Sequence, residues 1–317
     1  MSHNAAMMGC EFERTRCGAS SEGGTHLKRP SLQYRRDAPF VLLFLAPSLA
    51  GFLLFFILPF GAVAYYSLID NPVSGHFVGF ENYRILWASG SFRKAFANSL
   101  TFAGFGVPLL YAASLGLALL LRGKLPFRQS FRTMFLMPLV VPVASVILVW
   151  QTLFHWKGAI NGFFLHWGSD PVDWMNTRWA LAVMLIVFVW KNVGYNLIIF
   201  LAGLSNIPAE QYESASIDGA GAVRQFLHIT WPGLAPTSFF VIVMSIVQSF
   251  KVFRETYLVA GAYPNDAIYT LQHFMNNMFQ SLDYPKLTAA AVLLSIVIGV
   301  TVYILFRLER RSREALS

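Results

Sequence analysis

The stretch IPAEQYESASIDGAGAVRQFLHITWPGLAP, Ile207–Pro236, decides the fold, because it is a largely polar run between two long apolar segments. Pro208 suits the first turn of a helix, where its missing N–H would have no intrahelical partner. Gly219 and Gly221 predict the end of that helix, since glycine readily takes the left-handed conformation found at helix ends. The stretch therefore predicts a short helix, a glycine turn and a second short helix over about 222–229.

The composition of the whole chain is typical of a membrane protein. The chain has 317 residues, of which 56% are hydrophobic and 13% charged, whereas soluble domains carry about 25% charged residues. A helix needs about 20 apolar residues to cross the hydrocarbon core. We therefore predict an all-α integral membrane protein with six transmembrane helices, at Phe40–Tyr66, Asn98–Leu121, Thr133–Phe154, Arg178–Gly203, Leu234–Ala260 and Leu287–Phe306.

Basic residues gather at particular ends of these spans. The net charge of +8 comes mainly from the N-terminal tail, the 122–132 connection and the C-terminus. This distribution indicates membrane orientation rather than nucleic-acid binding, and the positive-inside rule puts both termini and the 207–236 loop in the cytoplasm. We expect a disordered cytoplasmic tail over 1–37, a transmembrane domain over 38–310 and a C-terminal tail over 311–317.

Several positions of the 207–236 loop resemble the EAA loop of binding-protein-dependent ABC importer permeases. That family pattern is E-A-A, three residues, G, nine residues, I-x-L-P, and it is matched in register by Glu213, Ala215, Gly219, Ile229 and Pro232. Ser214 and Trp231 depart from the pattern. The Ile217–Ala220 run is similar to the carbohydrate-uptake branch of the family, of the maltose and glycerol-phosphate type.

The resemblance implies a type I ABC importer permease fold in which this loop is a coupling helix that docks on an ATPase subunit. The residues expected to couple are Glu213, Ser214, Ala215, Asp218, Gly219, Ala220 and Gly221. An ordinary amphipathic loop is the alternative. The implied partners are a second homologous permease, two ABC ATPases that hold ATP and Mg, and an extracellular or periplasmic solute-binding protein.

Two further runs are similar to sugar permeases. V-G-x-x-N-Y and A-x-x-N-S-L occur within 78–100, and W-x-x-L-F and G-x-I-N within 150–161. The glycine-rich T-G-G-G-P motif of many such permeases is replaced at 260–264. The resemblance implies import of a sugar or related solute across the bacterial cytoplasmic membrane. Between these runs, Pro138 and Pro142 predict a kink in the third span, because each removes a backbone hydrogen bond.

Polar residues inside the fourth and fifth spans are candidates for a substrate path. A charge at mid-span costs roughly 2.5–3.5 kcal/mol on insertion scales, so it should face protein or water. Helix–helix hydrogen bonding is the alternative interpretation. We expect Lys251 and Glu255 to pair, because they are four residues apart. The candidate path residues are Trp190, Lys191, Asn192, Tyr195, Gln248, Lys251 and Glu255.

Enzyme chemistry finds no support in the sequence. The phosphate-binding motif G-x-x-x-x-G-K-[ST] is absent, as are H-E-x-x-H and a nucleophile elbow, so we expect no cofactor in this chain. Two other hypotheses remain open: a secondary transporter that couples ions through Lys191 or Glu255, and a membrane scaffold. Lys191, Lys251 and Arg254 outnumber Glu255, which raises an anionic solute as an alternative to a neutral saccharide.

Overall fold

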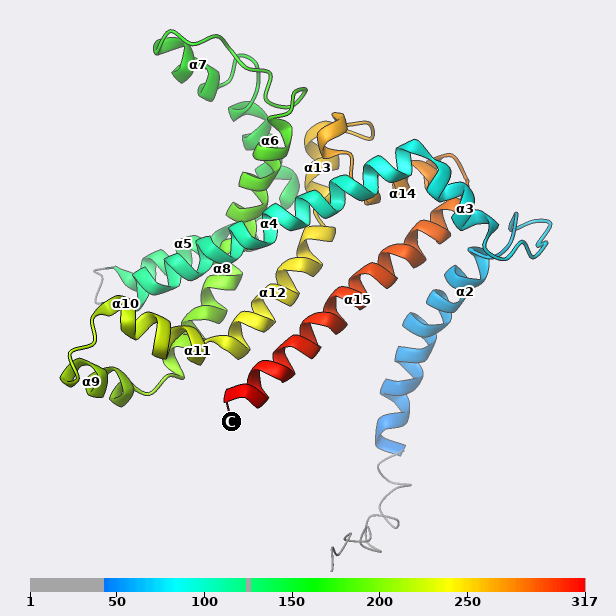
Figure 1. Ribbon diagram of the computed structural model, residues 1–317. Helices are drawn as coiled ribbons and strands as arrows, with labels where there is room; N and C mark the ends of the chain where they lie inside the picture. The colour runs from blue at the N-terminus through cyan, green and yellow to red at the C-terminus, as the bar shows by residue number, and fades with distance from the viewer. Residues whose placement is uncertain (1–42, 124–126, 317) are drawn as a thin grey trace, which may run out of the picture. The chain divides into compact units, whose positions relative to one another are not determined.

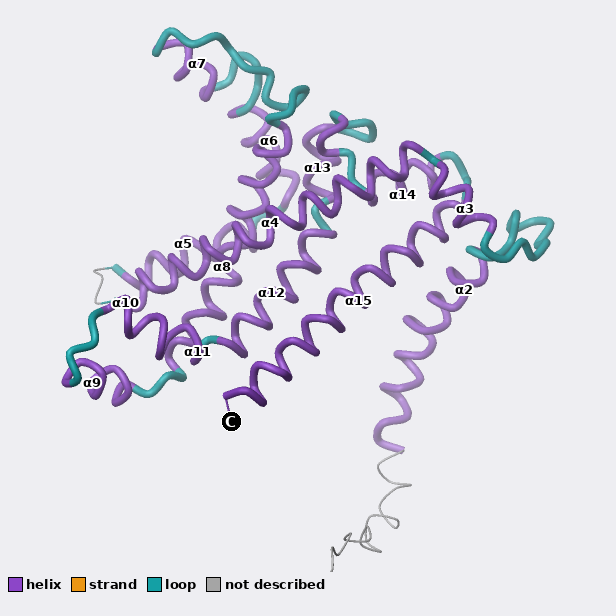
Figure 2. Tube along the Cα trace, in the orientation of Figure 1, coloured by secondary structure: helices purple, strands orange, loops and turns teal. Residues whose placement is uncertain are grey.

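The computed structural model describes residues 43–123 and 127–316, so the predicted N-terminal tail lies outside the described residues. The chain divides into a unit that ends at Ile57 and a larger unit that begins at Leu58. Helices and loops make up the described residues, apart from one isolated antiparallel bridge between Ile69 and Phe77 (Figure 2). The all-α prediction is confirmed.

Among the described residues, five helices are long and apolar enough to cross a membrane. They agree with five of the six predicted spans to within a few residues, except that α4 begins earlier and α15 ends later than we predicted. Their bounds are Leu43–Tyr66, which contains η1 Leu53–Ile57 and α2 Leu58–Tyr66; α4 Gly90–Arg122; α8 Ala180–Ser205; Ala235–Ala260, formed by α12 Ala235–Phe250 and α13 Phe253–Ala260; and α15 Tyr284–Leu316.

The sixth predicted span, Thr133–Phe154, is two helices rather than one kinked helix. α5 Arg128–Val140 and α6 Val143–Leu153 meet at an angle of 100°. Pro138 lies inside α5, while Val141 before Pro142 has φ −71° and ψ 134°. A proline clashes with a helical conformation of the preceding residue, so Pro142 ends the helix instead of bending it. Counted as one broken span, the pair brings the total to six.

Three helices of the larger unit, α4, α5 and α12, pack against α8 (Figure 1). α4 lies along α8 and also contacts α12, α5 packs on α8, and α15 contacts α12 and α2. α5 comes so close to α8 that a Cβ added to Gly194 would overlap the carbonyl of Phe135, and one added to Gly203 would overlap Thr237 of α12. These glycines let the helix backbones approach one another, as small residues do in membrane proteins.

Short helices connect the spans. Between α2 and α4 lies α3 Glu81–Ala88, and between α6 and α8 lies α7 Ala159–His166. η3 Asp266–Ile268 and α14 Leu271–Gln280 lie between α13 and α15. The loop between α8 and α12 holds four short elements: α9 Ala209–Ile217, α10 Ala222–Gln225, η2 Phe226–Thr230 and α11 Trp231–Gly233.

Candidate functional site

The loop Ile207–Pro236, called the central loop below, folds as a helix, a glycine turn and a second helical segment, as predicted. α9 ends at Ile217, and Gly219, two residues later, has a φ of +75°. The Gly219 N–H donates to the Ser216 carbonyl at 3.1 Å and the Ala220 N–H to the Ala215 carbonyl at 2.8 Å. These two bonds form a Schellman motif, which satisfies the last carbonyls of the helix.

Gly221 does not share this role. Its φ of −68° and ψ of 168° are extended backbone, and it is the N-cap residue of α10. The prediction that both glycines take left-handed geometry is therefore correct for Gly219 and wrong for Gly221. One left-handed residue is enough to end a helix, and the next residue then begins the following one.

Side-chain hydrogen bonds hold the two halves of the central loop together. The Gln225 amide donates to the Ser216 hydroxyl at 2.9 Å and to the Ala220 carbonyl at 3.0 Å. The hydroxyls of Tyr212 and Thr230 lie 2.9 Å apart. The loop is consequently an ordered unit.

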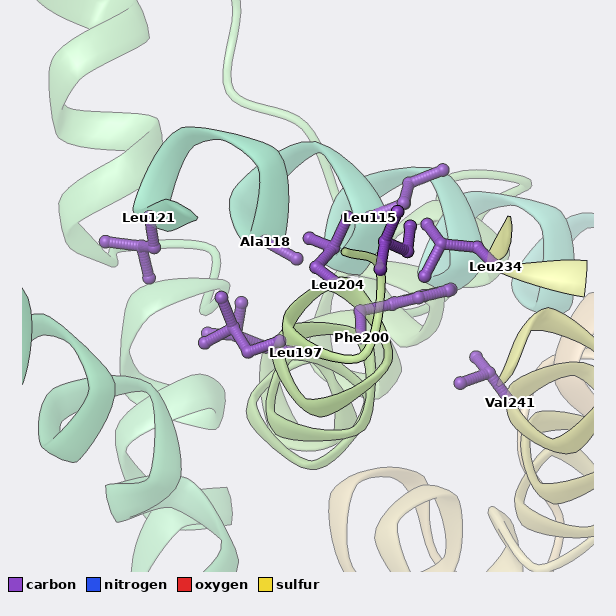
Figure 3. Close-up of a cluster of buried hydrophobic side chains, with 10 residues drawn as sticks. Leu115, Ala118, Leu121, Leu197, Phe200, Leu204, Leu234 and Val241 are labelled. Atoms are coloured by element: carbon purple, nitrogen blue, oxygen red, sulfur yellow. The ribbon is translucent and has the colours of Figure 1, made fainter. Parts of the chain in front are cut away.

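The central loop is also anchored in the hydrophobic core. Tyr212, Phe226 and Ile229 pack against a cluster of buried residues from α4, α8 and α12. Figure 3 shows members of this cluster, among them Leu115 of α4, Phe200 of α8 and Leu234, which directly precedes α12. At the end of α4, the Arg122 guanidinium lies 4.1 Å from the centroid of the Tyr212 ring, a cation–π contact. A displacement of the loop would therefore be transmitted to these helices.

The surface of the central loop carries the predicted coupling residues. Glu213, Ser214, Asp218, Gly219 and Gly221 are exposed, while Ala215 and Ala220 are half-buried.

Two apolar residues outside the predicted coupling set share this surface, Ile217 at 87% and Val223 at 73% exposure. The sequence could have indicated both, because each is a large aliphatic residue in a largely polar loop. Small residues bordered by exposed aliphatic ones offer a surface suited to another protein.

The polar residues of the fourth and fifth spans form a different kind of site. The Lys191 ammonium pairs with the Glu255 carboxylate, and the two side chains are 23% and 5% exposed. Arg254 lies beside them, with its Nη2 atom 3.9 Å from Glu255 Oε1. The predicted pairing of Lys251 with Glu255 is wrong. α12 ends at Phe250 and α13 begins at Phe253, so the helical spacing that would bring them together is interrupted.

One of the remaining candidate residues, Asn192, serves helix packing. Asn192 is buried and donates to the Phe188 carbonyl of its own helix at 2.7 Å. Its neighbour Asn196 donates to Ser245 Oγ at 2.8 Å, which joins α8 to α12. Tyr195 and Gln248 are half-buried. For Asn192 the geometry favours the helix-packing alternative.

Trp190 borders an apolar groove of about 450 Å³ at the bend between α5 and α6. Its ring meets Trp150 edge-on, with centroids 5.5 Å apart. The other lining residues are Met134, Met137, Pro138, Val141, Val146, Val149 and Leu153. The adjacent Gln151 was not among the predicted residues; its amide donates to the carbonyls of Leu258 and Val259 at 3.0 Å and so ties α6 to α13. Its signal was a polar residue inside an apolar span.

Within residues 43–123 and 127–316, no three His, Cys, Asp or Glu side chains are grouped so as to hold a metal ion. What the described side chains can do is bind through charge and hydrogen bonds. The site thus consists of an ordered surface loop and a charged group between broken spans.

Comparisons with known proteins agree with this architecture. Residues 85–314 match the family described as binding-protein-dependent transport system inner membrane component. The chain is 32% identical to the arabinooligosaccharides transport system permease protein AraP of Bacillus subtilis, over 87% of this chain and 89% of AraP. It is 31% identical to the sn-glycerol-3-phosphate transport system permease protein UgpA of Escherichia coli (strain UTI89), over 86% and 94% of the two chains.

A third relative is the sulfoquinovosyl glycerol transport system permease protein SmoG of Agrobacterium fabrum, 29% identical over 81% of this chain and 86% of SmoG. Among solved structures, a chain of a bacterial ABC transporter involved in the import of the acidic polysaccharide alginate superposes with a TM-score of 0.76. That match covers 88% of this chain and 97% of the other at 23% identity, and it supports the fold alone.

Proposed function

This chain belongs to the family of binding-protein-dependent transport system inner membrane components, and we propose that the solute it carries is a saccharide or a related polyol. It is a permease subunit of an ABC importer, a multi-pass inner membrane protein that is not itself an enzyme. The observation that supports the solute class is its similarity to permeases named for arabinooligosaccharides, sulfoquinovosyl glycerol and glycerol 3-phosphate.

We propose that the central loop is the contact to the ATPase subunit, with both termini on the same, cytoplasmic side. Its predicted coupling residues are mostly exposed, and Ile217 and Val223 add apolar contact area. Tyr212 and Arg122 connect the loop to α4, so closure of the ATPases would be transmitted to the spans.

The complete importer that we propose holds a second homologous permease, two ATPases that bind ATP and Mg, and an extracellular or periplasmic binding protein. The solute route in this chain would be lined by Trp190, Tyr195, Gln248 and Lys251, which are exposed or half-buried. Lys191 and Glu255 would border it as a neutralised pair. Aromatic and amide side chains suit the ring faces and hydroxyls of a saccharide.

Purification of the complex through a tag on this chain tests the proposal. We expect the two ATPase subunits and a second permease to be recovered with it. Proteoliposomes that contain the complex and its binding protein should take up solute only when ATP is supplied. Uptake that follows an ion gradient without ATPase subunits would instead support a secondary transporter that uses Lys191 and Glu255.

A further inference from the structure

The described spans carry more positive than negative charge away from their ends. Lys191, Lys251 and Arg254 lie within α8 and the Ala235–Ala260 span, and Glu255 is the one acidic residue among the inner parts of the spans that the structure describes. The Glu255 carboxylate is engaged by Lys191 and borders Arg254. These inner parts thus hold three cations and one carboxylate, and that carboxylate contacts Lys191 and Arg254 but not Lys251.

Lys251 continues a face of α12 that the helices of this chain leave open. Ser245 and Ser249 are buried on the face toward α8. Phe239 meets Phe306 of α15 with ring centroids 4.8 Å apart. The third face consists of exposed or half-buried residues at helical spacing: Phe240, Met244, Gln248 and Lys251.

The position of Lys251 along the span prevents it from reaching water at the span end. It lies nine positions before Ala260, where the span ends, and a continuous helix of that length would measure about 13 Å. A lysine side chain is much shorter than that, so it cannot extend to the interface as lysines near helix ends do. An ammonium group at this depth faces protein or a water-filled route, because lipid does not solvate it.

We propose that Lys251, with Arg254 as its neighbour, forms an anion-recognition subsite on the solute route, and that the solute is a saccharide or polyol bearing a carboxylate, phosphate or sulfonate. The Lys251 ammonium supplies three donors for a charge-assisted bond to the anionic group. The Gln248 amide, one turn earlier on the same face, supplies N–H donors for a hydroxyl. The inference rests on the proposed function, since it specifies the solute that the permease carries.

The test measures the electrostatic potential beside Lys251 in the complete importer, reconstituted in proteoliposomes. Gln248→Cys and Met244→Cys are made separately in a background with Cys10→Ser and Cys17→Ser. Each cysteine is treated with two thiosulfonate reagents of similar size, one carrying a sulfonate and the other a trimethylammonium group. We expect the sulfonate reagent to be favoured, and Lys251→Gln to lower the ratio of the two rates about tenfold.

Lys251→Arg should keep the ratio, because it keeps the charge. The matched control is Lys157→Gln, which removes an exposed lysine from the connection between α6 and α7 and should leave the ratio unchanged. We further expect glycerol 3-phosphate and galacturonate to slow the modification of Gln248→Cys, whereas glycerol and galactose do not. This protection should disappear with Lys251→Gln.

Three results would overturn the inference. If both cysteines are inert, this face is not on an aqueous route. If the ratio is indifferent to Lys251→Gln, a carboxylate of the partner permease neutralises the lysine. Equal protection by neutral and anionic compounds, or none by either, would reject the anionic solute. The proposed importer survives each of these results, because it is tested separately by the recovery of ATPase subunits and by ATP-dependent uptake.

Discussion

The central loop and the charged group of Lys191 and Glu255 are both held by side-chain hydrogen bonds, but these bonds span very different lengths of chain. In the loop, Tyr212 and Thr230 are 18 residues apart. Lys191 and Glu255 are 64 residues apart, and Gln151 is 107 from the carbonyl it binds. The loop therefore keeps its shape as a unit, whereas the charged group exists only while separate spans stay packed together.

The difference suits two tasks in a transporter. A unit with local order can move without losing its form, as the proposed contact to an ATPase subunit must. The charged group lies where two broken spans meet, since Val141 at the α5–α6 bend, Lys191 and Glu255 border the same small pocket. Interrupted helices are typical of the places where transporters bind solute. A rearrangement of the spans would make or break the Lys191–Glu255 pair.

The largest expected effect comes from breaking this long-range pair. Glu255→Gln leaves the Lys191 ammonium, only 23% exposed, without its carboxylate. We expect the free energy of unfolding to fall by about 3 kcal/mol, because an uncompensated buried charge remains. Thermal unfolding of the purified complex measures it.

Two further variants sharpen this prediction. The double variant Lys191→Met with Glu255→Met should regain most of the stability that Glu255→Gln loses, since apolar residues can replace a buried pair. Asp266→Asn, which breaks the exposed pair with Lys94, should change little. Equal melting of Glu255→Gln and the parent protein would mean that the charged group does not depend on span packing.

His273 of α14 combines local and distant contacts. Its Nδ1 atom lies 2.9 Å from the Thr270 hydroxyl, three residues away, while Phe253 of α13 packs edge-on against its fully buried ring. Burial lowers the pKa of His273 to about 4 from its usual 6.5. Between these values the unfolded chain binds more protons than the folded one, so stability is full above about pH 6.5 and falls as the pH drops toward 4.

We expect a loss of about 2 kcal/mol between pH 7 and pH 5 from this histidine. Thermal unfolding at several pH values, compared with His273→Asn, isolates it, because the variant should lack this part of the pH dependence. Parallel pH curves for the two proteins would show that His273 is accessible to protons in the folded state.

The same contrast between local and distant contacts explains what the sequence could predict. The α9 end at Gly219 and five spans were predictable because helix ends and apolar length are local properties. The partner of Glu255 was not, since it depends on how α8 packs against α13 and on the interruption after Phe250. The 100° turn after Val141 likewise exceeds the kink expected of Pro142, because a proline's neighbours decide between bending and ending a helix.

The next prediction tests the local order of the central loop. Gly219→Val puts a β-branched residue at φ +75° in open space, so the strain is confined to the backbone, roughly 1–2 kcal/mol. We expect the C-terminal end of α9 to reorganise and the uptake of solute per ATP hydrolysed to fall, while membrane insertion stays normal. Proteoliposome uptake and ATPase assays measure both quantities.

Gly168→Val is the matched control. Gly168 has the same φ of +75° and the same open surroundings, but it lies in the connection between α7 and α8. It should share the strain without the loss of coupling. If the two variants take up equal amounts of solute per ATP hydrolysed, the shape of the α9 end does not affect coupling to the ATPase subunit.

The smallest expected effect concerns a cation–π contact that joins the central loop to α4. Arg122, at the end of α4, lies over the Tyr212 ring of α9, 90 positions along the chain. Arg122→Met removes the cation and should cost about 0.5–1 kcal/mol, because such contacts are weak where the guanidinium is partly solvated. Arg122→Lys should retain part of that energy. A double-mutant cycle with Tyr212→Leu, read by thermal unfolding, isolates the pairwise interaction. Full additivity of the two single changes would mean that the loop is joined to α4 through the apolar cluster alone, and transport coupling should then be unaffected by Arg122→Met.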